Sequence, residues 1–185
     1  MVTDSQIKVQ LDKITPLVNQ IEGWLSNIEH LYKLVHMTDV PNIVEIGSFK
    51  GKSASCFAFA VKNRGSGRVY AVDHWETLAN YEAFIQNLTQ LDLMPYVEPI
   101  KMYSVVAAQQ WPVTRRIGLL YIDASHYYHS VREDFEYWSP YVEPGGYIVF
   151  DDVPSDEGPT RLTQELPKWY KKIDMGGNQV TFQKL

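Results

Sequence analysis

The chain has 185 residues, of which 45% are hydrophobic and 13% aromatic. That composition supports one domain with a hydrophobic core and argues against an intrinsically disordered chain. Lysine and arginine number 17 against 22 aspartates and glutamates, so the net charge is −5. Because no basic run stands out, we expect no nucleic-acid partner.

The sequence also lacks the signals of a membrane or secreted protein. No apolar run approaches the ~18 residues that a membrane span requires, and the N-terminus lacks the zones of a signal peptide. The single cysteine, Cys56, excludes an internal disulfide and a cysteine-based zinc site. These features predict a cytoplasmic protein with no membrane partner.

The expected elements begin with a helix over residues 16–37, where apolar side chains including Ile21 and Trp24 recur at helical spacing. Five β-like runs follow, each succeeded by a helical stretch. The strands are expected at residues 42–47, 68–73, 96–101, 117–123 and 146–151. The helices are expected at residues 51–62, 78–91, 105–111, 127–137 and 160–170. A brief hairpin around residues 176–178 ends the chain.

This alternation predicts one α/β domain over residues 1–185, made of a helical segment at 1–38 and a Rossmann-like core at 39–185. The core would be a doubly wound, mostly parallel sheet with a C-terminal antiparallel hairpin. Ligands of such sheets bind beyond the carboxyl ends of the strands. Four of the five strands deliver acidic residues there, which favours binding of a cation or of hydroxyl groups. These residues are Glu45, Asp73, Asp123, Asp151 and Asp152.

The turn after the first expected strand is rich in glycine. A phosphate-binding P-loop would need one more residue between Gly47 and Gly51, although Gly51-Lys52-Ser53 matches its end. The G-x-G-x-x-G turn of dinucleotide-binding folds is absent. The remaining pattern is E-x-G-x-x-x-G, starting at Glu45, in which Gly51 permits tight entry into the next helix.

Residues at the next two strand ends are candidates for binding a nucleoside. Asp73 can accept hydrogen bonds from both hydroxyls of a ribose, or it can cap a turn. Ser104 lies where a side chain would reach an adenine, although a serine there is also a good helix N-cap. His74 would flank the same ligand or the substrate.

The last two parallel strands predict a cation site and a base. Asp123, Asp151 and Asp152 would meet at one edge without a basic neighbour in sequence, which suits Mg²⁺, Mn²⁺ or Ca²⁺. The alternative is that these aspartates cap turns and helices. His126, three residues after Asp123, can take a proton from a hydroxyl, or it is an ordinary surface histidine. His129, one turn further, is expected to be structural.

Five segments together resemble class I S-adenosylmethionine-dependent methyltransferases, and within them the small metal-dependent O-methyltransferases of the macrocin, mycinamicin and cephalosporin-hydroxylase-like type. The segments are Glu22–Leu25, Val44–Gly51, Val69–Asp73, Tyr121–His126 and Gly145–Asp152. The resemblance implies that Asp123, Asp151 and Asp152 bind the metal and that His126 is the catalytic base. Together with neighbouring positions it implies a cofactor-binding set: Glu45, Gly47, Ser48, Phe49, Gly51, Ser53, Asp73, His74, Ser104 and Asp123.

The predicted function is O-methylation of a small molecule, with S-adenosylmethionine as cofactor and a divalent cation, Mg²⁺ first among the candidates. The acceptor would be a vicinal diol, a sugar or a catechol-like compound. Two alternatives stay open: a non-catalytic cofactor-binding partner subunit, and a nucleotide-binding protein that uses Gly51-Lys52-Ser53. The sequence does not decide whether the chain forms a homo-oligomer.

Overall fold

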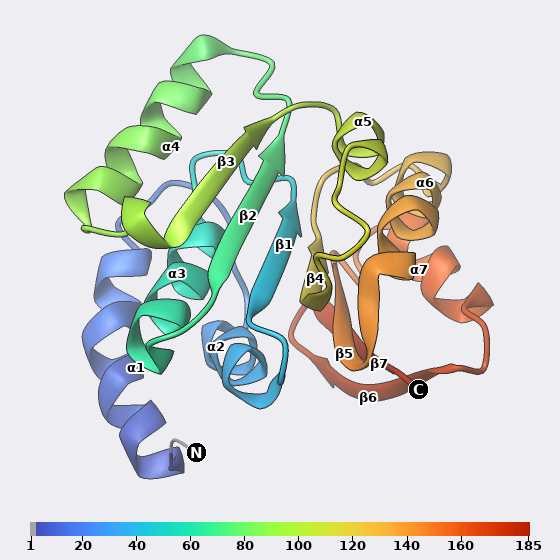
Figure 1. The fold of residues 1–185 in the computed structure, drawn as a ribbon, viewed down its shortest axis with the longest axis horizontal. Helices are drawn as coiled ribbons and strands as arrows, with labels where there is room; N and C mark the ends of the chain where they lie inside the picture. The colour runs from blue at the N-terminus through green and yellow to red at the C-terminus, as the bar shows by residue number, and fades with distance from the viewer. Residues whose placement is uncertain (1–2) are drawn as a thin grey trace.

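The computed structural model, which describes residues 3–185, has a seven-stranded mixed sheet with helices on both faces (Figure 1). The strands are β1 (Asn42–Ile46), β2 (Arg68–Asp73), β3 (Val97–Lys101), β4 (Ile117–Ile122), β5 (Val142–Asp151), β6 (Tyr170–Gly176) and β7 (Gln179–Lys184). The α-helices are α1 (Asp4–Val18), α2 (Ile28–Met37), α3 (Lys52–Arg64), α4 (Leu78–Gln90), α5 (Ser104–Gln109), α6 (Tyr128–Trp138) and α7 (Glu157–Glu165). Two 3₁₀ helices, η1 (Met94–Tyr96) and η2 (Ser139–Tyr141), precede β3 and β5.

The strand order is β3-β2-β1-β4-β5-β7-β6, with β7 antiparallel to both β5 and β6. Strands β1 to β5 are parallel, so their carboxyl ends lie at one edge of the sheet. The order reverses between β1 and β4, which is where ligands bind in such sheets. The doubly wound fold with a C-terminal hairpin is therefore confirmed. The hairpin is not brief as expected, because β6 has 7 residues and β7 has 6.

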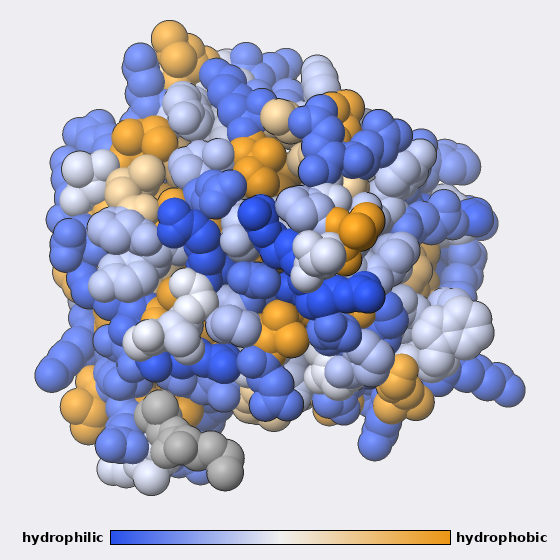
Figure 2. Space-filling model, viewed as in Figure 1, coloured by the Kyte–Doolittle hydropathy of each residue, from blue (hydrophilic) through white to orange (hydrophobic). Residues whose placement is uncertain are grey.

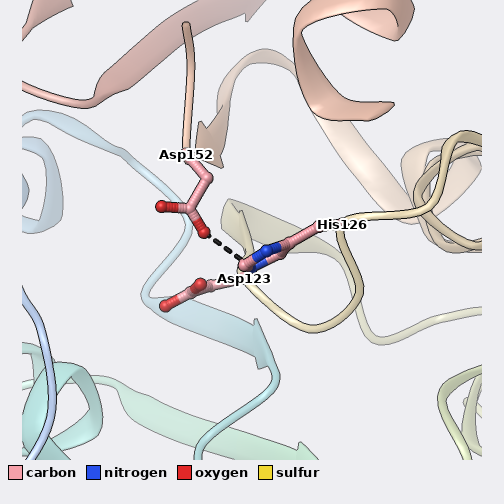
Figure 3. Close-up of side chains that lie close together, drawn as sticks. All are labelled: Asp123, His126 and Asp152. Atoms are coloured by element: carbon pink, nitrogen blue, oxygen red, sulfur yellow. Dashed lines mark ion pairs between the residues drawn. The ribbon is translucent and has the colours of Figure 1, made fainter. Parts of the chain in front are cut away.

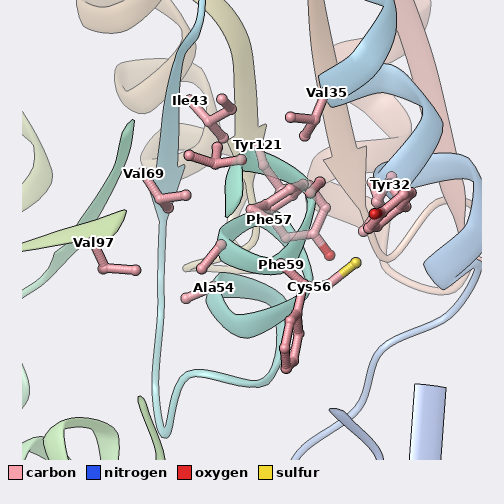
Figure 4. Packing of buried hydrophobic residues seen from close by; sticks show 14 of the residues in the cluster. Tyr32, Val35, Ile43, Ala54, Cys56, Phe57, Phe59, Val69, Val97 and Tyr121 are labelled. Carbon is pink, nitrogen blue, oxygen red and sulfur yellow. The ribbon is translucent and has the colours of Figure 1, made fainter. Parts of the chain in front are cut away.

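Two apolar layers hold the helices against the sheet. Helices α1 to α4 pack on one face, and α5 to α7 pack on the other. Figure 4 shows part of the first layer, where Phe57 of α3 approaches Tyr121 of β4 with ring centroids 5.4 Å apart. Cys56 of α3 is fully buried in the same layer, as a small core residue should be. Every residue of β4 is buried, which explains its unbroken apolar sequence.

The prediction of one helix over residues 16–37 is wrong. Helix α1 ends at Val18 and α2 begins at Ile28, and residues 19–27 (the 19–27 segment) connect them without helical structure. Gly23 has a φ of +130° and Asn27 a φ of +57°, both outside the helical region. As a result Trp24, expected on the buried stripe, is 97% exposed.

Helix α7 also differs from its expected limits, beginning at Glu157 and ending at Glu165 rather than spanning residues 160–170. Leu166 takes an extended conformation because it precedes Pro167, and a residue before proline avoids the helical region. Consequently the chain turns into β6 earlier than its apolar pattern indicates.

The surface has no broad apolar face on the side seen in Figure 2, where hydrophobic side chains are scattered among hydrophilic ones. Among residues 3–185, no helix combines the length and the apolar character that crossing a bilayer requires.

Candidate functional site

The turn after β1 is built around the carboxylate of Asp73, at the end of β2. Asp73 Oδ2 accepts hydrogen bonds from the backbone amides of Ser48 at 3.0 Å and Phe49 at 2.9 Å. Its Oδ1 accepts one from the amide of Trp75 at 2.6 Å, and the Trp75 indole donates to the Phe49 carbonyl at 2.7 Å. A carboxylate accepts about four hydrogen bonds, so these three amides leave room for about one more donor.

The two glycines of this turn are required by their neighbours. Gly47 has a φ of +87°, and a Cβ built on it would lie 2.1 Å from the backbone oxygen of Asp123. Gly51 has a φ of +88°, and a Cβ there would lie 3.0 Å from the ring of Phe84 in α4. Gly51 thus permits tight entry into α3, as expected. Gly47, in addition, lets β1 approach the end of β4, which the sequence did not indicate.

Glu45 lies beneath the turn, fully buried at the end of β1. Its Oε2 accepts a hydrogen bond from the Ser48 hydroxyl at 2.6 Å, and Ser53 of α3 lies close to the carboxyl group. Its Oε1 has no hydrogen-bond partner among the described residues. Burial raises the pKa of Glu45 to about 7, opposed by Ser48 and Ser53 and reinforced by the charge of Asp73. The carboxyl group supports the turn from below.

Substitution of Glu45 by glutamine is expected to make stability less dependent on pH. The folded protein keeps Glu45 protonated up to about pH 7, whereas the unfolded chain ionises it near pH 4.5. The wild type therefore loses stability as pH rises through this window, by about 2 kcal/mol between pH 5 and pH 8. Urea denaturation of both proteins at these pH values measures the difference. Parallel pH profiles would contradict a buried, protonated Glu45.

A cavity of about 360 Å³ opens beside Asp73, at the point where the strand order reverses. It brings together six residues of the predicted cofactor-binding set: Gly47, Phe49, Asp73, His74, Ser104 and Asp123. The other four lie outside it: Ser48 and Ser53 line a neighbouring cavity, and Glu45 and Gly51 are buried. Trp75, which the sequence suggested only as part of an aromatic or sugar-sized acceptor pocket, lies among these residues, and its indole is fixed by the hydrogen bond to Phe49.

Two residues of this cavity are themselves held by aromatic neighbours. The hydroxyl of Ser104 accepts a hydrogen bond from the indole of Trp138 at 2.9 Å, which ties α5 to α6. The ring of His74 stacks on that of Tyr103, with centroids 4.9 Å apart. Both side chains therefore have defined positions in the cavity wall.

Asp123, His126 and Asp152 converge from the loops after β4 and β5 (Figure 3). One ligand atom from each residue lies within 4.8 Å of the others, which is close enough to hold a metal ion. His126 Nε2 lies 2.8 Å from Asp152 Oδ2, and His126 Nδ1 lies 3.4 Å from Asp156 Oδ2. The imidazole is therefore held between two carboxylates.

Asp151, the third predicted metal ligand, faces inward instead. Its Oδ2 accepts a hydrogen bond from the Tyr121 hydroxyl at 2.8 Å, and Tyr121 in turn accepts one from Gln179 at 3.2 Å. Its Oδ1 is buried without a hydrogen-bond partner among the described residues. An unpaired buried carboxylate oxygen is costly, so this atom is suited to a cation.

The electrostatics of the cluster also favour a cation. Burial raises the pKa of Asp123 well above its usual value, and the charges of Asp151 and Asp152 raise it further. Burial also raises the pKa of Asp151, with Asp152 adding to the effect. A divalent cation would relieve this repulsion, and carboxylates suit Mg²⁺ or Mn²⁺.

Three residues that hold the cluster in place were not found from the sequence. Asp156 contacts His126, and the Asn178 amide donates to Asp152 Oδ1 at 2.8 Å. A Cβ on Gly158 would lie 2.1 Å from the His126 backbone oxygen, so α7 begins directly against the histidine loop. A possible sequence signal for Asp156 was its place four residues after Asp152, just before a helix.

Lys52, the lysine of the alternative phosphate-binding interpretation, is engaged elsewhere. Its ammonium donates a hydrogen bond to the Gly23 carbonyl in the 19–27 segment at 2.9 Å. The neighbouring Lys50 pairs with Glu22 of the same segment at 2.6 Å. These contacts count against nucleotide binding by Gly51-Lys52-Ser53.

A second cavity, of about 270 Å³, contains Asp123, His126 and Asp152 together with Trp24. It shares Gly47, Phe49 and Asp123 with the cavity beside Asp73. The two cavities therefore meet at the ends of β1 and β4.

Comparison with known proteins identifies the family of the chain. A family model described as a methyltransferase domain matches residues 44–153, which is more than half of the chain. The uncharacterized protein y4gI of Sinorhizobium fredii is 30% identical over 137 residues, covering 71% of this chain and 15% of that protein. The uncharacterized protein R132 of Acanthamoeba polyphaga mimivirus is 33% identical over 114 residues, covering 59% of this chain and 50% of that protein. The chain thus spans half or less of the length of these two relatives.

Solved structures share the fold at low sequence identity. The O-methyltransferase TomG of Streptomyces achromogenes has a TM-score of 0.71 and 17% identity, covering 100% of this chain and 91% of its own. An O-methyltransferase of Bacillus cereus has a TM-score of 0.69 and 18% identity, covering 100% and 93%. An rRNA methylase of Streptococcus thermophilus has a TM-score of 0.67 and 16% identity, covering 88% and 99%. Because both small-molecule and RNA enzymes appear, the fold does not select the acceptor.

Proposed function

The chain belongs to the methyltransferase-domain family, and we propose that it transfers a methyl group from S-adenosylmethionine to a hydroxyl oxygen of a small molecule with the help of a divalent cation. The TomG structure was solved with S-adenosylmethionine and the B. cereus structure with S-adenosylhomocysteine, and both proteins are O-methyltransferases. These relatives support oxygen as the atom that is methylated here.

The observation that carries the proposal is the junction of the two cavities. The cavity beside Asp73 has the acidic and aromatic walls that a nucleoside needs, and the other cavity contains His126. Both are lined by Asp123. Group transfer requires donor and acceptor to be held in contact, and a shared wall places them side by side.

The residues of the two cavities fit both the cofactor and the divalent cation. Asp73 retains acceptor capacity for a ribose hydroxyl, and Ser104 and His74 would flank the base. Asp123 and Asp152 would hold the cation, whereas Asp151, the third expected ligand, lies outside the group of ligand atoms that are within 4.8 Å of one another. When bound, the cofactor supplies an electrophilic methyl group and the cation lowers the pKa of a hydroxyl that it touches.

Residues of this chain would remove the proton of the acceptor and position the two ligands. His126 Nε2 lies 2.8 Å from Asp152 in this structure, and it would take the proton of the acceptor hydroxyl once Asp152 has turned to hold the cation. The Asp156 carboxylate beside Nδ1 would keep the imidazole oriented and stabilise it once protonated. Gly47 and Phe49 would bring the two ligands together without an intervening side chain.

Calorimetric titration of S-adenosylhomocysteine tests the cofactor, and Mn²⁺ binding followed by electron paramagnetic resonance tests the cation. We expect Asp152→Ala to weaken Mn²⁺ binding at least about 10-fold, because a ligand is lost, and to leave S-adenosylhomocysteine affinity unchanged. Asp12→Ala, which removes an exposed carboxylate of α1 that lines neither of the two cavities, is the matched control.

Each possible outcome tests a different part of the proposal: the cofactor, the metal ligand or catalytic turnover. Folded wild-type protein that does not bind S-adenosylhomocysteine would overturn the methyltransferase assignment. Unchanged Mn²⁺ binding in Asp152→Ala would overturn the ligand assignment alone. Binding of S-adenosylhomocysteine without turnover of any acceptor would favour a non-catalytic partner subunit instead.

A further inference from the structure

Asp134 of α6 is a buried carboxyl group that the proposed reaction does not use. It is 5% exposed and shares the buried face of α6 with Val131 and Phe135. Helices α5 and α6 lie side by side (Figure 1), and Asp134 lies close to Ser104 at the start of α5. Because Ser104 lines the cavity beside Asp73, the buried carboxyl group lies behind the wall of the proposed cofactor site.

No positive group neutralises Asp134 among the described residues. Of the elements packed against α6, α5 has no ionisable side chain, and the charged residues of α7 are exposed, as are the other charged residues of α6. The ionisable groups of β4 and η2 are tyrosine hydroxyls that donate elsewhere: Tyr121 to Asp151, and Tyr141 to the Ala108 carbonyl. Burial raises the pKa of Asp134 to about 6, which Ser104 opposes and the charge of Glu133 reinforces. The carboxyl group is therefore mainly ionised at neutral pH.

The Ser104 hydroxyl does not cap its helix, although a serine there is a good N-cap. The N-cap of α5 is Tyr103, and no side chain caps the helix. The Ser104 oxygen instead accepts the hydrogen bond from the Trp138 indole at 2.9 Å. Trp138 lies four residues after Asp134, so the indole and the carboxyl group reach Ser104 from the same face of α6.

These two neighbours determine which hydrogen bonds Ser104 has left. A hydroxyl group has one hydrogen to donate and two lone pairs that accept. The Trp138 indole occupies one lone pair, and an ionised Asp134 takes the hydrogen. The Ser104 oxygen can then accept one more hydrogen bond but cannot donate one. The base of adenosine has a single N–H donor group, which is its exocyclic amino group.

We infer that Asp134 is a positioning residue which, together with Trp138, makes Ser104 an acceptor for the exocyclic amino group of the cofactor's adenine. The same site then selects against a base with an oxo group in that place, because two oxygen acceptors would face each other without a hydrogen. This inference rests on the proposed function, since it takes the cavity beside Asp73 as the cofactor site. It adds the group by which the base is selected.

Calorimetric titration of two ligands tests the inference without requiring turnover. S-adenosylhomocysteine has the amino group, and S-inosylhomocysteine has an oxo group instead. At pH 8 we expect the wild type to bind the amino compound about 10-fold more tightly. At pH 5, where Asp134 is protonated and no longer takes the Ser104 hydrogen, the preference should fall to about 3-fold or less. Other ionisable groups of the cavity act on both ligands, so their effects cancel in the ratio.

Three variants distinguish positioning of Ser104 from a general effect on stability. Asp134→Asn should show the same preference at both pH values, because its side chain does not ionise. Ser104→Ala should reduce the preference to about 2-fold or less, and adding Asp134→Asn to it should change nothing further. Glu133→Gln, which removes an exposed carboxylate from the adjacent position, should keep both the preference and its pH dependence.

The role of Asp134 would be overturned by a wild-type preference that does not change with pH, or by a pH dependence that persists in Asp134→Asn or in Ser104→Ala. If Asp134→Asn does not fold, Ser104→Ala decides the question. Failure of the proposed function looks different from these results. A folded wild type that binds neither compound overturns the proposed function, whereas equal binding of both compounds overturns this inference alone.

Discussion

Alanine in place of His126 is expected to lower the rate of methyl transfer by about 100-fold or more. The imidazole lies 2.8 Å from Asp152 and 3.4 Å from Asp156, in the cavity that would receive the acceptor. Removing it would leave the acceptor proton without a positioned base. Among the described residues, no hydrogen bond or ion pair joins His126 to the turn around Asp73, so S-adenosylhomocysteine affinity should stay unchanged. Single-turnover kinetics and calorimetry measure the two quantities.

The same variant distinguishes a base from a metal ligand. His126 is close enough to Asp123 and Asp152 to ligate an ion with them, although the proposed role is that of a base. A base can be lost with little change in Mn²⁺ affinity, whereas loss of a ligand weakens Mn²⁺ binding together with the rate. His129→Ala, which removes an exposed histidine from the same helix region, should preserve both. If His126→Ala weakens Mn²⁺ binding, the base assignment is wrong.

The fold could be predicted because its signals are local. Buried parallel strands such as β4 have unbroken apolar sequences, and the alternation of strands with helices leaves few topologies. Asp73, Asp123 and Asp152 follow these strands directly, so their arrival at one edge of the sheet was predictable. For the same reason the cavity beside Asp73 contains most of the residues that were expected to bind the cofactor.

What could not be predicted depends on contacts between distant residues. The helical pattern of residues 16–37 predicts one helix, but the 19–27 segment is not helical, and its Gly23 carbonyl accepts a hydrogen bond from the Lys52 ammonium. Likewise Asp151 and Asp152 are adjacent in sequence and were assigned the same role. Asp151 ends β5 and is held in the interior by the Tyr121 hydroxyl, whereas Asp152 lies after the strand with a φ of +58° and pairs with His126. No sequence spacing encodes such a partner.

Alanine at Gly47 is expected to lower the free energy of unfolding by about 3 kcal/mol and to abolish detectable S-adenosylhomocysteine binding. Part of the loss comes from a φ of +87°, and the rest from a Cβ that would lie 2.1 Å from the Asp123 oxygen and 2.7 Å from the Ala124 Cα. Backbone atoms cannot rotate away as a side chain can. Urea denaturation and calorimetry measure the two losses.

The variant Gly65→Ala distinguishes the cost of backbone strain from the cost of the steric clash at Gly47. Gly65 has a similar φ of +77°, but a Cβ there would meet no described atom within 4 Å. Its substitution should therefore cost about 1 kcal/mol, from backbone conformation alone. The excess loss at Gly47 then measures how rigidly β1 is held against the end of β4. Equal losses at both positions would mean that the Asp123 backbone moves aside readily. In that case the junction between the two cavities would not depend on the glycine.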